Sequence, residues 1–474
     1  MDTTFIKAMQ LIAALSLLVI VHEFGHYMFA RIFGMRVNRF YLFFNYKFSL
    51  LKYLPREGKL LFISKEDDKA LLSLKVGKAH PEKEEGKQKK ASWRDTVYGI
   101  GWIPLGGYCQ ISGMIDETQN LNSLSEVAEP WEFRAKPAYQ RLLVMLGGVI
   151  MNFVLAVIIY SGIAFYWGES HINFRDVSEG FDFVPEAQKA GFRNGDIPII
   201  VDGKELESTA SILDIVEAKE VKVLRNKVDT VTIVLPEDFI FNVSDAGGFM
   251  SMRVPVIVKS LVSGEPAIKA GVEEGDRFVS VDNVNTPSYT EFSEQLLARA
   301  GQPTEFVVER NGAHVSFEAI PTADGKLGIG LKLPAEIYPV RYVRYGLFAS
   351  IPKGISNGAS TMGSYVNSLK YVFTKRGAES IGGFGAIGSM FPSSWNWLSF
   401  WETVAFLSII LAFMNVIPIP ALDGGHVLFL IWEMITGRKP SDKFLEYAQM
   451  TGMFLLFALL LYANGNDLYR FFIK

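Results

Sequence analysis

Long apolar runs separated by charged stretches dominate the pattern of hydrophobic and polar positions along the chain. Four runs approach the roughly 20 apolar residues that a helix needs to cross the ~30 Å hydrocarbon core of a bilayer. They cover about residues 5–26, 142–167, 401–422 and 446–463. The pattern predicts a polytopic α-helical membrane protein with four transmembrane helices and a large soluble segment between the second and third helices.

The distribution of Lys and Arg orients these helices, because short loops rich in positive charge stay on the cytoplasmic side. Residues 31–94 carry an excess of Lys and Arg over Asp and Glu. The short loop after the third run contains Arg438, Lys439 and Lys443. Both loops are therefore expected to be cytoplasmic. Both chain termini and the segment 168–400 then face the opposite side.

The composition agrees with a membrane protein: 49% of the residues are hydrophobic, 36 are phenylalanines, and the mean hydropathy is +0.19. The formal net charge of −3 is uninformative by itself, because the charges are segregated along the chain. Cys109 is the one cysteine, so a cysteine-rich metal site is excluded. We expect the lipid bilayer and membrane-embedded proteins as partners, and no nucleic acid.

The soluble segment contains an internal repeat. Residues 187–202 align without a gap with residues 267–282. In each copy a short helix is predicted to end at a glycine, and a Gly-Asp turn leads into a strand. Two small β-rich domains in tandem are therefore expected, over 175–252 and 253–335. The pattern is similar to that of PDZ domains, which bind extended peptides by strand addition. The repeat leaves open whether either copy binds a ligand.

The remaining boundaries follow from the same pattern. The four predicted transmembrane helices occupy 1–30, 141–168, 401–435 and 444–465. Residues 31–140 are expected to be a cytoplasmic or membrane-associated β region, and residues 336–400 a linker with an amphipathic segment. Within the β region, residues 99–108 are aromatic and punctuated by glycines. This favours a membrane-reentrant β-hairpin, since irregular backbone at membrane depth must be buried in protein or face an aqueous cavity.

The first apolar run ends in His22-Glu23-Phe-Gly-His26. Two histidines four residues apart project from one face of a helix and can bind one metal ion. Glu23 is then held near the open coordination position, where its carboxylate can take a proton from water. A chance match would bury three ionisable groups without a compensating metal, at a high cost in free energy. We therefore predict a zinc-dependent hydrolytic site inside the membrane.

A catalytic zinc ion needs a third protein ligand. The first carboxylate after His26 is Glu57, which lies beyond an expected change of chain direction. Asp423 stands out because it lies inside an apolar segment, 415–424, where a carboxylate is costly and a functional role is the default expectation. In the predicted orientation Asp423 lies at a similar depth to His22. Two prolines interrupt the helix just before it.

The two motifs, with the repeat between them, resemble the site-2 protease family of M50-type intramembrane zinc metalloproteases. The similarity is to the bacterial branch with tandem PDZ domains, and it covers the whole chain in order. It implies one zinc ion per chain, with Glu23 as the general base. The implied zinc ligands are His22, His26 and Asp423.

The resemblance also implies roles in substrate binding. Asn415 would help to hold the substrate backbone or the developing oxyanion. The segment 99–108 would present the substrate as an added strand, with Gly106, Gly107 and Tyr108 as candidate binding residues. Residues 382–388 take the place of the family's Gly-Pro-containing gating segment, although the proline is absent here.

The resemblance implies a multi-pass protein of the bacterial inner membrane, with the PDZ-like domains and both termini on the periplasmic side. Its substrates would be single-span membrane proteins, of the anti-sigma-factor or remnant-signal-peptide class. Two alternatives stay open: a PDZ-containing membrane adaptor with a non-catalytic metal site, and a zinc transporter. Glu23 argues against the adaptor, because a structural site does not require it. The single intramembrane site argues against the transporter. The oligomeric state is left open.

Overall fold

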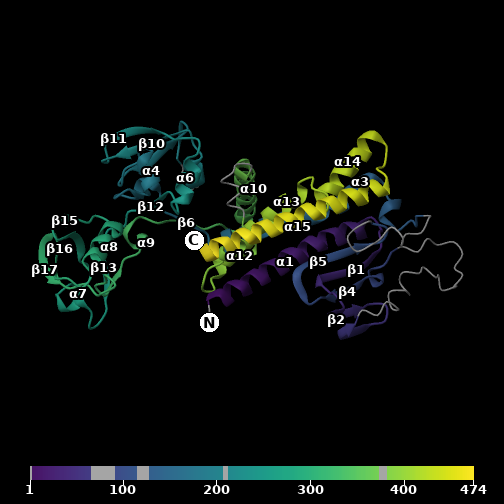
Figure 1. Ribbon diagram of the computed structural model, residues 1–474, viewed down its shortest axis with the longest axis horizontal. Coiled ribbons are helices and arrows are strands. Elements are labelled where there is room, and N and C mark those ends of the chain that lie inside the picture. The colour runs from purple at the N-terminus through teal and green to yellow at the C-terminus, as the bar shows by residue number, and fades with distance from the viewer. Residues whose placement is uncertain (1–2, 66–90, 115–127, 207–211, 373–381, 474) are drawn as a thin grey trace. The chain divides into compact units, whose positions relative to one another are not determined.

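The computed structural model describes residues 3–65, 91–114, 128–206, 212–372 and 382–473 (Figure 1). The chain forms two compact units. The first unit combines Met1–Gly168 with Arg344–Lys474, and the second is Glu169–Val343. The apolar helices belong to the first unit and the internal repeat belongs to the second.

Four helices of the described part are long and apolar enough to cross a membrane. They are α1 (Thr3–Ile32), α3 (Ala138–Tyr166), α13 (Trp397–Val416) and α15 (Asp442–Ile473). This agrees with the number of helices predicted from the apolar runs. Helix α3 is central among them, because α1, α13 and two further helices all pack against it.

The segment predicted as one transmembrane helix, 401–435, consists of two helices. Helix α13 ends at Val416, and α14 (Asp423–Thr436) starts after a turn that contains Pro418 and Pro420. Proline lacks the N–H group that would continue the hydrogen-bond ladder, so the helix stops there. The correction matters for the site, because it makes Asp423 the first residue of a new helix.

The region between the second unit and α13 is more ordered than a linker. It contains α10 (Leu347–Val372) and α12 (Phe384–Ser389) in the described part. Helix α10 crosses α3 closely at Gly354, where a Cβ atom would lie 2.1 Å from the Ser161 hydroxyl oxygen. The amphipathic pattern of this segment therefore belongs to a long helix that packs on the central helix.

A five-stranded sheet follows α1, with the strand order β3-β2-β4-β1-β5. Its strands are β1 (Val37–Phe44), β2 (Phe48–Leu54), β3 (Lys59–Lys65), β4 (Val97–Ile100) and β5 (Ile103–Ile111). Strand β1 pairs in parallel with β4 and antiparallel with β5. The β-hairpin expected over 99–108 is therefore not formed, since β1 lies between the two strands. The chain crosses the end of β1 at Gly101, where a Cβ would lie 2.2 Å from the Phe44 carbonyl oxygen.

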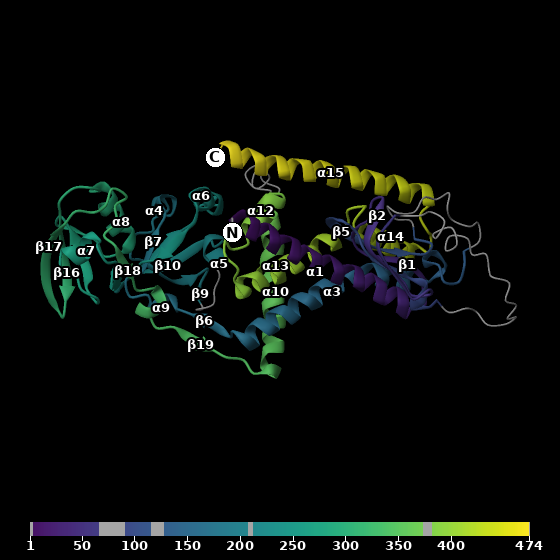
Figure 2. The same cartoon turned by 90° about the horizontal axis from the view of Figure 1, so that it is seen from below.

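The sheet lies against the C-terminal half of α1 (Figure 2). Tyr27 of α1 and Tyr98 of β4 share a hydrogen bond of 2.7 Å between their hydroxyl groups. Strand β5 is at the edge of the sheet and packs along α1. Gly107 of β5 permits this contact, because a Cβ there would lie 2.8 Å from a methyl carbon of Val19. One short helix, η1 (Trp93–Asp95), precedes β4, and another, η3 (Phe133–Ala135), precedes α3.

The second unit contains two β-rich modules, each with its own buried apolar core. The first module has the sheet β11-β10-β8-β9 and the second the sheet β15-β14-β16-β17, so the strand order is the same. The strands of the first sheet are β8 (Ile197–Val201), β9 (Lys204–Glu205), β10 (Glu220–Arg225) and β11 (Asp229–Val234). Those of the second are β14 (Arg277–Val281), β15 (Val284–Asn285), β16 (Thr304–Arg310) and β17 (Ala313–Ala319).

Shorter elements complete the two modules. Paired strands are β7 (Phe181–Phe183) with β12 (Met250–Met252), β13 (Val258–Leu261) with β18 (Ile329–Leu331), and β6 (Glu169–His171) with β19 (Arg341–Val343). The helices are η4 (Phe174–Asp176), α4 (Pro185–Lys189), α5 (Ile212–Val216), α6 (Phe239–Asp245), α7 (Pro266–Lys269), α8 (Tyr289–Ala298) and α9 (Pro334–Ile337).

An Asp–Arg pair occurs at the same place in both modules. Arg225 donates from Nε and Nη2 to the two carboxylate oxygens of Asp196, at 2.9 and 2.7 Å. Arg310 does the same to Asp276, at 2.7 and 2.6 Å. Each arginine also donates to the carbonyl of the glycine that follows the short helix. The ungapped sequence repeat thus corresponds to a repeated fold.

Candidate metal centre

The two histidines of α1 face one another at the side of the helix that packs on α3. His22 and His26 are one turn apart, and their Nε2 atoms are separated by 3.2 Å. This follows from helical geometry, since residues i and i+4 lie one above the other on the same face. The Nδ1 atom of His26 lies 2.8 Å from the carbonyl oxygen of Val144 in α3. The Nε2 atoms therefore remain for a shared partner.

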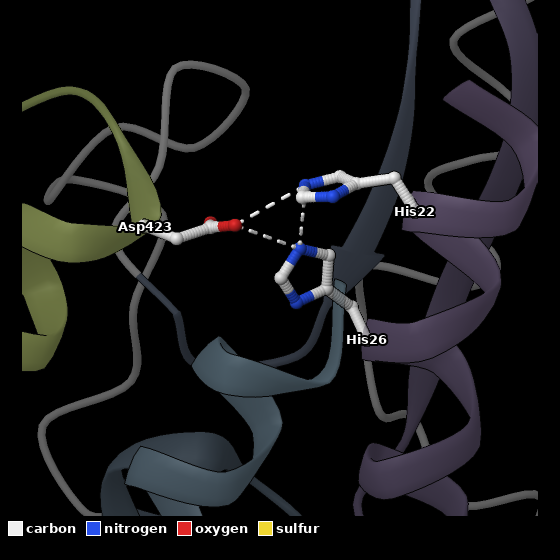
Figure 3. Close-up of side chains that lie close together, drawn as sticks. All are labelled: His22, His26 and Asp423. Carbon is white, nitrogen blue, oxygen red and sulfur yellow. Dashed lines mark hydrogen bonds and ion pairs between the residues drawn. The ribbon is translucent and has the colours of Figure 1, made fainter. Parts of the chain in front are cut away.

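Asp423 supplies that partner from the other end of the chain (Figure 3). Its Oδ2 atom lies 3.1 Å from Nε2 of His22 and 3.3 Å from Nε2 of His26. All three side chains are at most 16% exposed. Among the described residues, these three form the one group of His, Cys, Asp or Glu side chains that could hold a metal ion.

The spacing of the three atoms fits a zinc ion. Two ligand atoms at ~2.0–2.1 Å from zinc and at a tetrahedral angle are about 3.3 Å apart. The observed separations of 3.1 to 3.3 Å agree with this value. The Oδ2 atom of Asp423 is also buried without a hydrogen-bond donor. Two imidazoles and one carboxylate converge through the atoms that bind zinc, and they leave a fourth position for water or substrate.

A tight turn places Asp423. Ala421 has a φ angle of 80°, in the left-handed region that residues with a Cβ atom seldom adopt. Gly424 lies so close to the end of α13 that a Cβ there would come within 2.2 Å of the Ile417 carbonyl oxygen. The residues around Asp423 therefore adopt a strained backbone conformation, which brings the Asp423 carboxylate to the two histidines. Strain of this kind is typical of functional sites.

Glu23 borders a cavity of about 210 Å³ together with the three converging side chains. The backbone amide of Cys109 in β5 donates a hydrogen bond to the Glu23 carboxylate. The other walls come from β5, from the turn before α14 and from α14 itself. The cavity is lined in part by Phe44, Gly107, Tyr108, Cys109, Ile111, Met114, Met145, Ala421, Leu422, His426 and Gln449. The space beside the candidate ligands is thus large enough for a segment of backbone.

The other residues singled out from the sequence lie in or near this cavity. The Nδ2 atom of Asn415 lies 3.5 Å from Nε2 of His22. Gly107 and Tyr108 line the cavity, whereas Gly106 precedes them in β5 and is not among its lining residues. Tyr108 is fixed by stacking on Tyr41, with ring centroids 5.3 Å apart. Three of these four residues, Asn415, Gly107 and Tyr108, therefore lie beside the candidate metal centre or line its cavity.

Sequence reasoning missed the contribution of α3. Gly148 faces both imidazoles, and a Cβ there would lie 2.4 Å from Cε1 of His22. The side chain of Asn152 reaches Nδ1 of the same histidine at 3.2 Å. A polar residue in the middle of the apolar run 142–167 was the signal that could have drawn attention to Asn152.

Comparison with known proteins gives consistent results. A model of peptidase family M50 matches residues 10–58 and 87–459. The regulator of sigma E protease of Haemophilus influenzae is 24% identical over 488 residues, with 97% of this chain and 98% of that protein covered. The protease RseP of Yersinia pestis is 26% identical over 492 residues, with 97% of each chain covered.

A further relative is a Rickettsia conorii protein whose name describes a zinc metalloprotease. It is 25% identical over 479 residues, with 97% of this chain and 98% of that protein covered. Among solved structures, an HtrA-type protease with tripeptide matches 29% of this chain and 54% of its own, at 16% identity and a TM-score of 0.13. That last similarity is too low to support an inference about the fold.

Proposed function

Because the chain belongs to peptidase family M50, we propose that it is an intramembrane zinc endopeptidase that cuts single-span membrane proteins. Membership of the family and the names of the relatives make it a zinc metalloprotease. The four apolar helices make it a membrane protein. The observation that carries the proposal is the convergence of His22, His26 and Asp423 beside Glu23.

In this proposal His22 and His26 would hold zinc through Nε2, and Asp423 would hold it through Oδ2. When bound, zinc acts as a Lewis acid and lowers the pKa of water in its open position to about 7. The carboxylate of Glu23 accepts the proton of the attacking water and later delivers a proton to the leaving amine. The amide of Cys109 keeps that carboxylate in place.

Asn415 lies near the end of α13, beside the candidate metal centre. Its side-chain amide is a neutral donor 3.5 Å from Nε2 of His22. Such a donor stabilises the negative charge that develops on the carbonyl oxygen during attack. We assign Asn415 to the substrate backbone or the oxyanion for that reason.

Among the described strands, β5 is the edge strand of its sheet, and it lies next to Glu23. A helical substrate has its backbone groups paired internally, so the scissile bond must be unwound before it can be attacked. Pairing an extended segment with an edge strand satisfies the freed N–H and C=O groups. Residues Gly106, Gly107 and Tyr108 are the stretch of β5 that would form these bonds.

The second unit would select substrates outside the membrane. Its two modules are PDZ-like in this proposal and lie on the periplasmic side of a bacterial inner membrane, together with both chain termini. One relative is named for regulating sigma E, which points to anti-sigma factors as the substrate class, with remnant signal peptides as the second class. A prior cut that shortens the external part of the substrate would let it pass the two modules.

The test uses the full-length protein, purified in detergent, with a single-span membrane substrate. Wild type is expected to bind one zinc ion and to cut the substrate. Glu23→Gln should retain the zinc and lose cleavage, because the variant keeps the ligands and removes the base. His22→Ala should lose both. Glu402→Gln, in α13 and away from the cavity lining, is the matched control and should cut normally.

Each result has a defined meaning. Cleavage by Glu23→Gln at the wild-type rate would refute the role of the base. Zinc binding without cleavage by the wild-type protein, against every single-span substrate tried, would favour the membrane adaptor with a non-catalytic metal site. Wild-type zinc affinity in His22→Ala would refute the proposed ligand set.

A further inference from the structure

Helix α3 places a polar group behind each histidine of α1. The carbonyl oxygen of Val144 lies 2.8 Å from Nδ1 of His26. The side-chain amide of Asn152 lies 3.2 Å from Nδ1 of His22. Asn152 is fully buried, with 0% of its surface exposed. Val144 and Asn152 are about two turns apart on the same face of α3. This spacing lets each of them contact one of the two imidazoles on α1.

The chemistry of the histidines dictates what these groups must be. An imidazole that uses Nε2 for a metal carries its hydrogen on Nδ1, and this hydrogen needs an acceptor. The Val144 carbonyl is such an acceptor for His26. His22 also requires an acceptor for its Nδ1 hydrogen, and the Asn152 side chain lies next to that nitrogen.

The orientation of the Asn152 amide follows from its surroundings. With Nδ2 toward the imidazole, Nδ1 of His22 would have to be the unprotonated nitrogen, and Nε2 would then be blocked for the metal. In that orientation the Oδ1 atom of Asn152 is also buried without a hydrogen-bond donor. Because the two ends of an amide have the same shape, the partners decide which end faces the ring. With Oδ1 facing His22, the oxygen gains a donor and Nε2 is free.

We propose that Asn152 is a positioning residue for the metal centre, with its side-chain oxygen accepting the Nδ1 hydrogen of His22. The contact fixes the tautomer and the ring plane of His22, so that Nε2 points to the place shared with His26 and Asp423. It also makes the imidazole a stronger ligand, since the hydrogen bond increases its basicity. The inference rests on the ligand set given under the proposed function.

The position of Asn152 is itself secured. The hydroxyl group of Ser408 in α13 donates to the Asn152 backbone carbonyl at 2.7 Å, and Ser408 is fully buried. Helix α13 therefore holds α3 at the residue that contacts His22. A rigid support of this kind is what an outer hydrogen-bonding partner of a metal ligand requires.

The experiment measures zinc affinity of the full-length protein in detergent by competition with a chromophoric chelator. Asn152→Leu has nearly the shape of asparagine but no acceptor, and it should bind zinc roughly 10–100-fold more weakly. Asn152→Asp keeps an acceptor at the same place and should bind zinc at least as tightly as wild type. Gly162→Ala, on the same helix at a position where a Cβ would meet nothing within 4 Å, is the control and should retain the wild-type affinity.

The thermal unfolding temperature of the zinc-free proteins separates positioning from folding. Weaker zinc binding by Asn152→Leu with unchanged unfolding of the zinc-free protein supports the proposal. Wild-type affinity in Asn152→Leu overturns it. Should that variant not fold, Asn152→Asp decides alone: at least wild-type affinity supports the proposal, and a tenfold loss overturns it. His22→Ala tests the ligand set independently, because retained affinity there would refute the proposed function and not only the role of Asn152.

Discussion

Gly25 of α1 and Gly147 of α3 touch so closely that a Cβ atom on Gly25 would lie 2.2 Å from the carbonyl oxygen of Gly147. The next glycine of α3, Gly148, lies equally close to the imidazoles. A Cβ there would come within 2.4 Å of Cε1 of His22 and 2.7 Å of Nε2 of His26. The distance between the two helices, and with it the position of both rings, depends on the absence of side chains at these points.

Gly148→Ala is therefore expected to displace the imidazoles and to reduce zinc affinity by at least tenfold. Overpacking of this kind also costs about 1–3 kcal/mol in the free energy of unfolding. Zinc affinity and the thermal unfolding temperature would be measured together. The matched control is Gly162→Ala on the same helix, where a Cβ would meet nothing within 4 Å. Equal zinc affinity in both variants would contradict the prediction.

Helix α14, which begins with Asp423, is tied to α3 by an ion pair between Arg141 and Glu433. Both side chains are largely buried, at 8% and 18% exposure. Glu433→Gln leaves an unpaired charge beside α14, which typically costs about 3–5 kcal/mol of stability. We expect a lower unfolding temperature and weaker zinc binding, because α14 positions Asp423.

The double variant Arg141→Met with Glu433→Met tests whether the loss comes from the unpaired charge. Replacing both partners by apolar side chains is often neutral or stabilising. The double variant should therefore be more stable than Glu433→Gln, and a double-mutant cycle gives the coupling. A double variant that is as unstable as the single one would show that packing, and not charge, is responsible.

The segment 382–388 includes all but the last residue of α12 and is held by α15. The carboxylate of Asp467 accepts hydrogen bonds from the amides of Gly383 and Ala386, at 2.9 and 3.1 Å. Asp467→Ala should release this contact at a cost of about 1 kcal/mol, the usual value of such a cap. Hydrogen exchange of peptides that cover α12 should become faster. The exposed Glu446→Ala on α15 should leave that exchange unchanged.

The stability of the second β module should depend on pH through Asp276. Burial raises the pKa of Asp276, but hydrogen bonds from Arg310 and from the Glu273 amide outweigh it and hold the pKa below the ordinary 3.8. A carboxylate with a lowered pKa stabilises the folded state fully above its ordinary pKa, and this contribution is lost as the pH falls through the folded value.

The measurement is hydrogen exchange of peptides from β14 to β16, corrected for intrinsic rates. Wild type should be protected more than Asp276→Asn at pH 6, and the difference should shrink below about pH 4. Asp324→Asn removes an exposed carboxylate of the same module and should behave as wild type at both pH values. A difference that stays constant with pH would contradict the role given to Asp276.

The parts of this structure that follow from short-range geometry could be predicted from the sequence. Helical spacing places His22 and His26 on one face, and apolar length marks the four long helices. The repeat in the second unit was readable because both copies keep the same Asp at the same distance from the same glycine. The prediction of Asp423 as a ligand depended more on the order of the motifs along the chain and on the family resemblance, because no short-range geometry connects this residue to α1.

The parts that depend on long-range packing could not be predicted. The sequence 97–111 is β-prone, yet nothing local indicates that β1 separates β4 from β5. That arrangement depends on the chain crossing at Gly101, where only a glycine fits against the Phe44 carbonyl. Asn152 could be noticed as a polar residue in an apolar run, but its partner lies on another helix. The packing of α3 against α1 determines which imidazole nitrogen Asn152 contacts.

Helix α3 contributes none of the three converging side chains, yet it contacts the two imidazoles through a carbonyl, a side-chain amide and a glycine. Grafting His-Glu-Phe-Gly-His onto an unrelated transmembrane segment would therefore copy the donors and leave out the surface that orients them. The smallest transplantable version of this centre is a helix pair, completed by the turn that carries the aspartate. To change which cation this centre binds, a designer would therefore start with α3, the helix that supplies none of the three candidate ligands.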